Sequence, residues 1–149
     1  MRRVLLALCI CLALSPACGS DTAPTTPTMP QIDLTGTWTG HLIVGSASAS
    51  MTWTLTQSNG AVSGPVLIVL PTGIVLLNGA LTGTLSGAVL TYSIAVGAGG
   101  IPAQPQCTGK LGGTMTATIG ATSTLAGNIA VTSSTCTTGV AAGNLTLTR

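Results

Sequence analysis

The stretch MTWTLTQ, residues 51–57, alternates apolar and hydroxyl-bearing side chains. Met51, Trp53 and Leu55 occupy the odd positions, and threonines occupy the even positions between them. Because successive side chains of a β-strand point to opposite faces, this period of two predicts a strand with one apolar and one polar face.

The same alternation recurs along the chain and defines further residues of the apolar face. These residues are Ile68, Leu90, Tyr92, Ile94, Val96, Leu111, Met115, Ile119, Leu145, Leu147 and Arg149. Turn-forming residues such as Asn59-Gly60 and Pro71-Thr72-Gly73 separate the alternating segments. The pattern predicts strands at 35–44, 49–57, 61–70, 76–84, 88–96, 107–119, 124–132 and 140–149, of which 76–84 alternates least clearly.

These segments favour an all-β domain over residues 34–149. Eight short strands with one apolar face close into an antiparallel up-and-down barrel or, alternatively, fold over as a β-sandwich. Threonine supplies an uncharged polar outer surface. Since so few charges are present to protect an open sheet edge, we expect the closed barrel.

Residues 1–17 resemble a signal peptide. Arg2 and Arg3 precede an apolar run at 4–14, and small residues follow at Ser15 and Ala17. A helix of that length rises about 16 Å, which is half of the ~30 Å hydrocarbon core, so the run is too short for a permanent span.

The stretch LSPAC, residues 14–18, resembles a bacterial lipobox that ends in Cys18. The alternative is ordinary cleavage after Ala17, which would release a soluble protein with an unpaired thiol at its N-terminus. Because such a thiol is reactive, we expect Cys18 to be lipidated. Residues 18–33 then form a Pro/Thr-rich tether. The expected location is the bacterial cell envelope, anchored by lipid in the outer membrane and facing the periplasm or the cell surface.

Cys107 and Cys136 remain as a pair in the exported domain. Folding the two strands about the turn at 120–123 places Cys107 opposite Cys136. The apolar face of Met115 and Ile129 requires a register that differs by one residue, so we expect a disulfide together with a bulge near Ser133.

Composition excludes several function classes. Beyond the signal peptide the charged side chains are Asp21, Asp33, Lys110 and Arg149, which sum to zero, so no basic patch for nucleic acid is expected. The domain has no Glu and a single histidine, His41, which lies on the face opposite Trp38. We therefore expect no catalytic residues, no metal site and no cofactor.

The segment LTGTWTG, residues 34–40, resembles the G-x-W signature of the calycin superfamily, which includes lipocalins and avidins. The run GALTGT at 79–84 also resembles an avidin strand. The resemblance implies that Gly36, Trp38 and Arg149 close one end of a barrel, with the arginine packed across the indole. The aromatic set of a biotin site and the C-terminal helix of lipocalins are missing from this sequence.

Two functions of different classes follow. In the first, the barrel binds a small apolar ligand. The loop at 97–106 is long enough for a lid or a contact loop, with a slack connection as the alternative. In the second, the inward residues pack against one another, and the protein is a structural or interaction module whose protein partners the sequence does not identify. The candidate lining residues are Met51, Trp53, Leu55, Ile68, Leu90, Tyr92, Ile94 and Met115.

Overall fold

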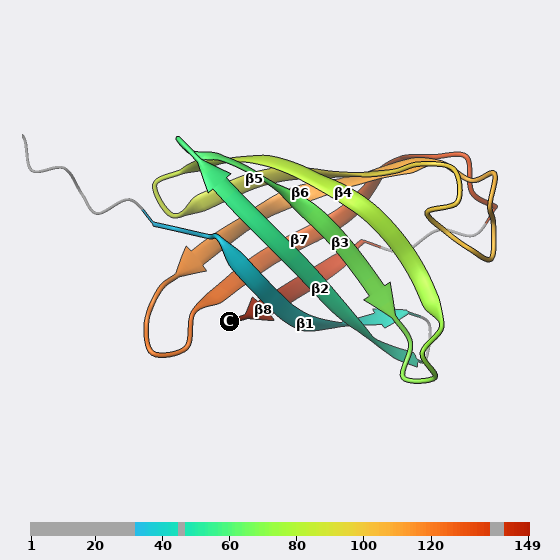
Figure 1. Cartoon of the computed structure of the whole chain (residues 1–149), viewed down its shortest axis with the longest axis horizontal. Coiled ribbons are helices and arrows are strands. Elements are labelled where there is room, and N and C mark those ends of the chain that lie inside the picture. Colours follow the sequence, from blue (N-terminus) through green and yellow to red (C-terminus); the bar gives the residue numbers. More distant parts are fainter. Residues whose placement is uncertain (1–31, 45–46, 138–141) are drawn as a thin grey trace, which may run out of the picture.

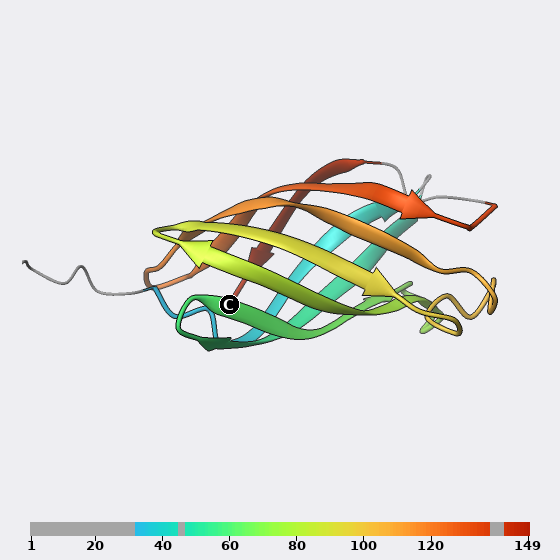
Figure 2. The same ribbon diagram turned by 90° about the horizontal axis from the view of Figure 1, so that it is seen from above.

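The computed structural model describes residues 32–44, 47–137 and 142–149 and places eight strands among them. Figure 1 shows the strands inclined to the long axis of the molecule, and the turned view shows them on both sides of a common interior (Figure 2). The strands are β1 (Gly36–Val44), β2 (Ala47–Ser58), β3 (Ala61–Val69), β4 (Val75–Ser86), β5 (Val89–Val96), β6 (Gly109–Thr118), β7 (Thr124–Ser134) and β8 (Gly143–Thr148).

Each strand pairs antiparallel with the next one along the chain, and β8 pairs with β1 to complete a closed barrel. This confirms the predicted antiparallel barrel of eight strands over the alternative sandwich. All eight predicted strands are present, and their ends differ from the prediction by at most three residues. The segment with the least regular alternation forms β4.

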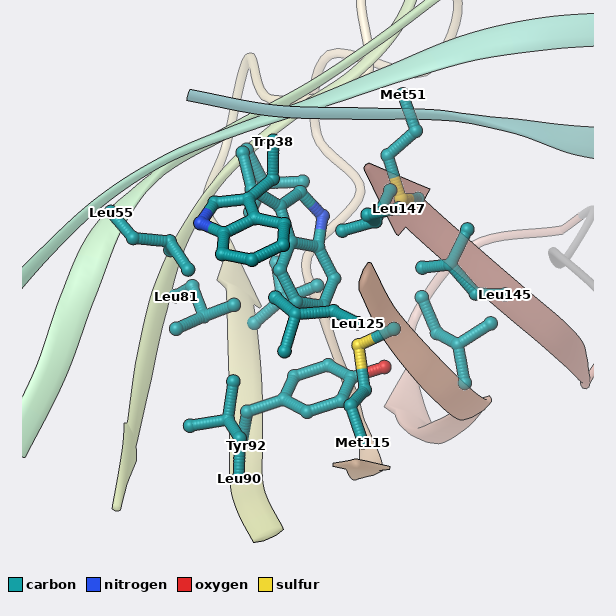
Figure 3. Close-up of a cluster of buried hydrophobic side chains, with 14 of the residues drawn as sticks. Trp38, Met51, Leu55, Leu81, Leu90, Tyr92, Met115, Leu125, Leu145 and Leu147 are labelled. Atoms are coloured by element: carbon teal, nitrogen blue, oxygen red, sulfur yellow. The ribbon is translucent and has the colours of Figure 1, made fainter. Parts of the chain in front are cut away.

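The period of two is visible in the pairing of β1 with β2. Trp38 lies opposite Trp53, and both indoles are fully buried. The adjacent pair, Thr39 and Thr52, lies on the outer surface. The predicted inward positions form one apolar core, to which seven of the eight strands contribute the labelled side chains of Figure 3.

One predicted core residue lies elsewhere. Ile119 is 47% exposed and follows the end of β6 at Thr118. The strand stops because residues 119–123 form the turn into β7, so the alternation at that point does not place the side chain inside.

Hydroxyl groups cover the outer face. Register-aligned threonines run across five neighbouring strands, from β6 through β7, β8 and β1 to β2: Thr118, Thr124, Thr148, Thr39 and Thr52. These β-branched residues suit a pleated backbone and still offer water a hydrogen-bonding group.

The two ends of the barrel differ. At the closed end, on the left of Figure 1, lie the short turns after β2, β4 and β6 and the two ends of the described barrel chain at Ile32 and Arg149. The opposite end, called the loop end, carries the connection at 70–74 and the much longer connection at 97–108. The part of the chain that the structure describes contains no helix able to span a membrane.

Candidate functional site

Trp38 and Arg149 close one end of the barrel. The Trp38 indole N–H donates to the carbonyl of Leu34 at 2.8 Å, and both residues are fully buried. The Arg149 guanidinium carbon lies 4.8 Å from the centre of the Trp38 ring, within the range of a cation–π contact. The guanidinium also donates to the carbonyls of Thr35 and Asp33.

Gly36 makes room for this arrangement. Its φ is +134°, in the region that favours glycine, and a Cβ at this position would lie 3.1 Å from Arg149 Cδ. The three residues named by the calycin resemblance therefore meet at the closed end.

Residues 32–34, which precede β1, are hydrogen-bonded across the same end. The Gln57 side-chain amide donates to the carbonyl of Ile32 and accepts from the backbone N–H of Leu34. Hydrogen bonds from the hydroxyl and backbone of Thr35, together with the nearby Arg149 charge, lower the pKa of the exposed Asp33 carboxyl. Asp33 and Arg149 thus belong to the structure of the closed end.

The eight candidate lining residues face the interior, as predicted, but they fill it. Each belongs to the core cluster, and the most exposed of them, Tyr92, is 5% exposed. Figure 3 shows Met51, Leu55, Leu90, Tyr92 and Met115 pointing toward one another from strands on several sides of the barrel. The complete set is Met51, Trp53, Leu55, Ile68, Leu90, Tyr92, Ile94 and Met115.

Two aromatic residues of this cluster contact each other. The rings of Trp53 and Tyr92 meet edge to face, with their centres 4.9 Å apart. The Tyr92 hydroxyl donates to the carbonyl of Asn128 at 2.9 Å, and burial raises the pKa of this phenol. The Trp53 indole N–H is buried, and no acceptor for it lies among the described residues.

A small apolar pocket lies at the loop end, between the loop at 97–106 and the core. It has a volume of about 40 Å³ and lies among Leu77, Val96, Ile101, Leu111 and Val131. Since one water molecule needs roughly 10–15 Å³ of such volume, this pocket holds about three water molecules. A drug-sized ligand needs about 300 Å³ or more, so the pocket as it stands is too small for one.

The loop at 97–106 is closed by hydrogen bonds of its own. Gly99 N–H donates to the carbonyl of Pro105, and Asn78 N–H on β4 donates to the carbonyl of Gly100. Ile101 packs partly buried against the core. The loop, for which the sequence left a lid, a contact loop and a slack connection open, therefore lies over the loop end as a cap.

The predicted disulfide is present. Cys107 and Cys136 are bonded, with their Cα atoms 4.9 Å apart. The pairing of β6 with β7 shifts register between Lys110 and Leu111: Lys110 lies opposite Ser133 and Leu111 opposite Val131, so Thr132 is the extra residue. This is the bulge expected near Ser133, and it reconciles the disulfide with the inward position of Met115.

The remaining candidate groups are dispersed. His41 and Lys110 are exposed on the outer face of β1 and β6, as the alternation predicts for the histidine. Among the described residues no three metal-binding side chains gather at one place. The predicted signal peptide at 1–17, the predicted lipidation site Cys18 and most of the predicted tether at 18–33 lie outside the described residues.

The sequence did not predict a groove on the outer surface, where β8 meets β1. It has a volume of about 600 Å³ and is lined by residues of β1, β2 and β8. Apart from Gly40 and the inward Met51, the lining residues are ordinary outward residues of their strands, so no local pattern marks the groove. It arises from the way the first and last strands meet.

The fold and the closed end define an eight-stranded, antiparallel up-and-down β-barrel with a Trp–Arg closure. Comparisons with protein-family models, with curated proteins and with solved structures found no match to this chain.

Proposed function

We propose that this chain is a lipid-anchored, non-enzymatic protein of the bacterial cell envelope whose barrel serves as a rigid display domain. The observation that carries the proposal is that the protein's own side chains fill the interior. Trp53 and Met115, for example, are fully buried. Inward residues fill small barrels of this strand number in the same way.

The anchor rests on the lipobox-like stretch that ends in Cys18. Two acyl chains give stable attachment to a membrane, whereas one gives only reversible binding. The tether enters the barrel at the closed end, where Gln57 binds the backbone of Ile32 and Leu34. The loop end, with its disulfide and cap, is then the end farther from the point of attachment.

The distribution of titratable groups supports a role without catalysis. Asp33 contacts Arg149 at the closed end, while His41 and Lys110 lie on different strands of the outer face. Tyr92 is buried, and its hydroxyl already donates to a backbone carbonyl. Acid–base catalysis needs a base close to the group it acts on, and these side chains do not form such a pair.

One observation favours a second candidate, which is a carrier of a small apolar ligand. The buried Trp53 N–H has no acceptor among the described residues, and unsatisfied buried groups of this kind are uncommon in proteins. A ligand with one acceptor atom would satisfy it, provided that the core side chains and the cap over Ile101 move aside.

Native mass spectrometry of the full-length protein, purified in mild detergent from its own envelope, separates the two candidates. The display proposal predicts the mass of the acylated polypeptide with no further noncovalent molecule. A stoichiometric apolar molecule that is released on denaturation would overturn the display proposal and establish the carrier.

A further inference from the structure

We propose that the groove between β1, β2 and β8 binds a neutral, hydroxyl-rich ligand, that is, an uncharged carbohydrate. This site opens on the outer surface of the barrel. Its volume of about 600 Å³ falls within the range of small-molecule sites.

The groove arises because the barrel closes over a short distance. The pairing of β1 with β8 consists of two residue pairs, Thr39 with Thr148 and Gly40 with Leu147. Gly40 permits this contact, since a Cβ there would lie 2.3 Å from the carbonyl oxygen of Thr146. Beyond Gly40 no further pairs form between the described parts of these strands, and Figure 1 shows β1 and β8 separating toward the loop end.

Polar side chains line much of the groove, together with Gly40 and the inward Met51. They come from β1, β2 and β8 and include the imidazole of His41, the amide of Asn144 and the hydroxyls of Ser50, Thr52, Thr146 and Thr148. Hydroxyl, amide and imidazole groups can each both donate and accept a hydrogen bond. A sugar hydroxyl has the same dual capacity, so the groove and a glycan are complementary in hydrogen bonding.

The hydrogen-bonding capacity of these groups is available to a ligand. Elsewhere on the outer face, polar side chains bind one another: the Asn128 side-chain oxygen accepts from both the backbone N–H and the hydroxyl of Thr114. Asn144, opposite Asn128 on the neighbouring strand, makes no such bond within the described residues. Of the groove hydroxyls, that of Thr148 alone has a protein partner there, the carbonyl of Thr39 at 3.4 Å.

The charge of the lining selects against ionic ligands. The charged side chains of the described chain, Asp33, Lys110 and Arg149, are absent from the lining. Recognition of phosphate or carboxylate depends mainly on charged donors such as Arg and Lys. Because no Trp, Tyr or Phe ring lines the groove to stack on a sugar face, we expect millimolar affinity for a single oligosaccharide.

The test is an NMR titration of the full-length, ¹⁵N-labelled protein in detergent micelles with cellotriose, maltotriose and the trimer of N-acetylglucosamine. At least one of these should produce saturable shifts confined to the backbone amides of 39–41, 50–52 and 144–148. No saturable shift in those amides with any of the three sugars would overturn the proposal. Tighter binding of trigalacturonate, which has the same size but carries carboxylates, would overturn the preference for neutral ligands.

Matched variants localise the binding. Thr52→Val combined with Thr146→Val removes two hydroxyls while keeping the β-branched shape, and should weaken binding by about tenfold. Thr116→Val changes an exposed threonine of β6 outside the groove and should leave the affinity unchanged. Thermal unfolding checks that each variant is folded; equal affinities for all three proteins would contradict the assignment of the site.

Discussion

Arg149, the last residue of the chain, lies over Trp38 of the first strand, with the guanidinium carbon 4.8 Å from the ring centre. The Arg149 backbone also exchanges two hydrogen bonds with Ser123 in the turn between β6 and β7. One residue therefore joins the first strand, the last strand and a turn at the closed end. This contact lies at the end of the barrel where the short β1–β8 pairing also occurs.

Replacing Arg149 tests that contact. Arg149→Ala should fold and should lower the free energy of unfolding by about 0.5–2 kcal/mol through loss of the cation–π contact, with a change in tryptophan fluorescence. Urea denaturation followed by fluorescence measures both effects. Thr82→Ala, which alters an exposed threonine of β4 outside the β1–β8 contact, serves as the control. If Arg149→Ala had the stability and emission of the parent protein, the contact would have no role in closing the barrel.

The proposed lipid anchor predicts the behaviour of Cys18→Ser. Without the thiol no acyl chains are attached, so the protein should move from the detergent-requiring envelope fraction to the soluble fraction. Metabolic labelling with radioactive palmitate should mark the parent protein and not the variant. A Ser20→Ala variant controls for changes near the processing site. Persistent sedimentation of Cys18→Ser with the envelope would show that another feature holds the protein there.

The disulfide between Cys107 and Cys136 should stabilise the barrel by restricting the unfolded chain. Closing a loop of about 30 residues corresponds to about 3–4 kcal/mol in the chain-entropy model. Cys107→Ala combined with Cys136→Ala should lower the free energy of unfolding by that amount, and a reducing agent should have no further effect on the variant. Two free thiols in the unfolded, non-reduced parent would contradict the bond.

Tyr92 predicts a loss of stability in alkali. Burial raises the pKa of its phenol above the ordinary value, so ionisation favours the unfolded chain. Its contribution is complete below about pH 10, the unfolded pKa, and falls as the pH rises above that value. Tyr92→Phe should cost about 1 kcal/mol at neutral pH through loss of the bond to Asn128.

The readout for Tyr92 is the free energy of unfolding measured between pH 8 and pH 12. The parent should lose stability across the upper half of that range, and Tyr92→Phe should lose less. Identical pH profiles for the two proteins would indicate that the phenol ionises freely in the folded state.

The sequence predicted the strands well because their pattern is local. Alternation as in 51–57 identifies a strand and its inward face without reference to any distant residue. The disulfide and its bulge were also predictable, because a hairpin relates residues on its two sides by simple counting. Ile119 was misplaced because alternation alone does not show where a strand ends and a turn begins.

Properties set by three-dimensional fit could not be predicted in this way. Whether inward side chains such as Trp53 and Met115 leave a cavity depends on how they interlock across the barrel, which the order of residues does not reveal. The groove depends on where the β1–β8 pairing ends after Gly40, which is a contact between the two ends of the chain. The Trp38–Arg149 closure was expected from a resemblance, and the spacing of residues did not predict it.

The central claim, a barrel filled by its own side chains, is tested most directly by the stability of Met115→Ala in urea. Met115 is fully buried in the core. Since truncation there would leave a void, we expect a loss of about 2–5 kcal/mol, whereas Thr116→Ala at the neighbouring exposed position should cost less than about 1 kcal/mol. A loss below about 1 kcal/mol for Met115→Ala, as expected of a residue that borders an open ligand cavity, would contradict the packed interior.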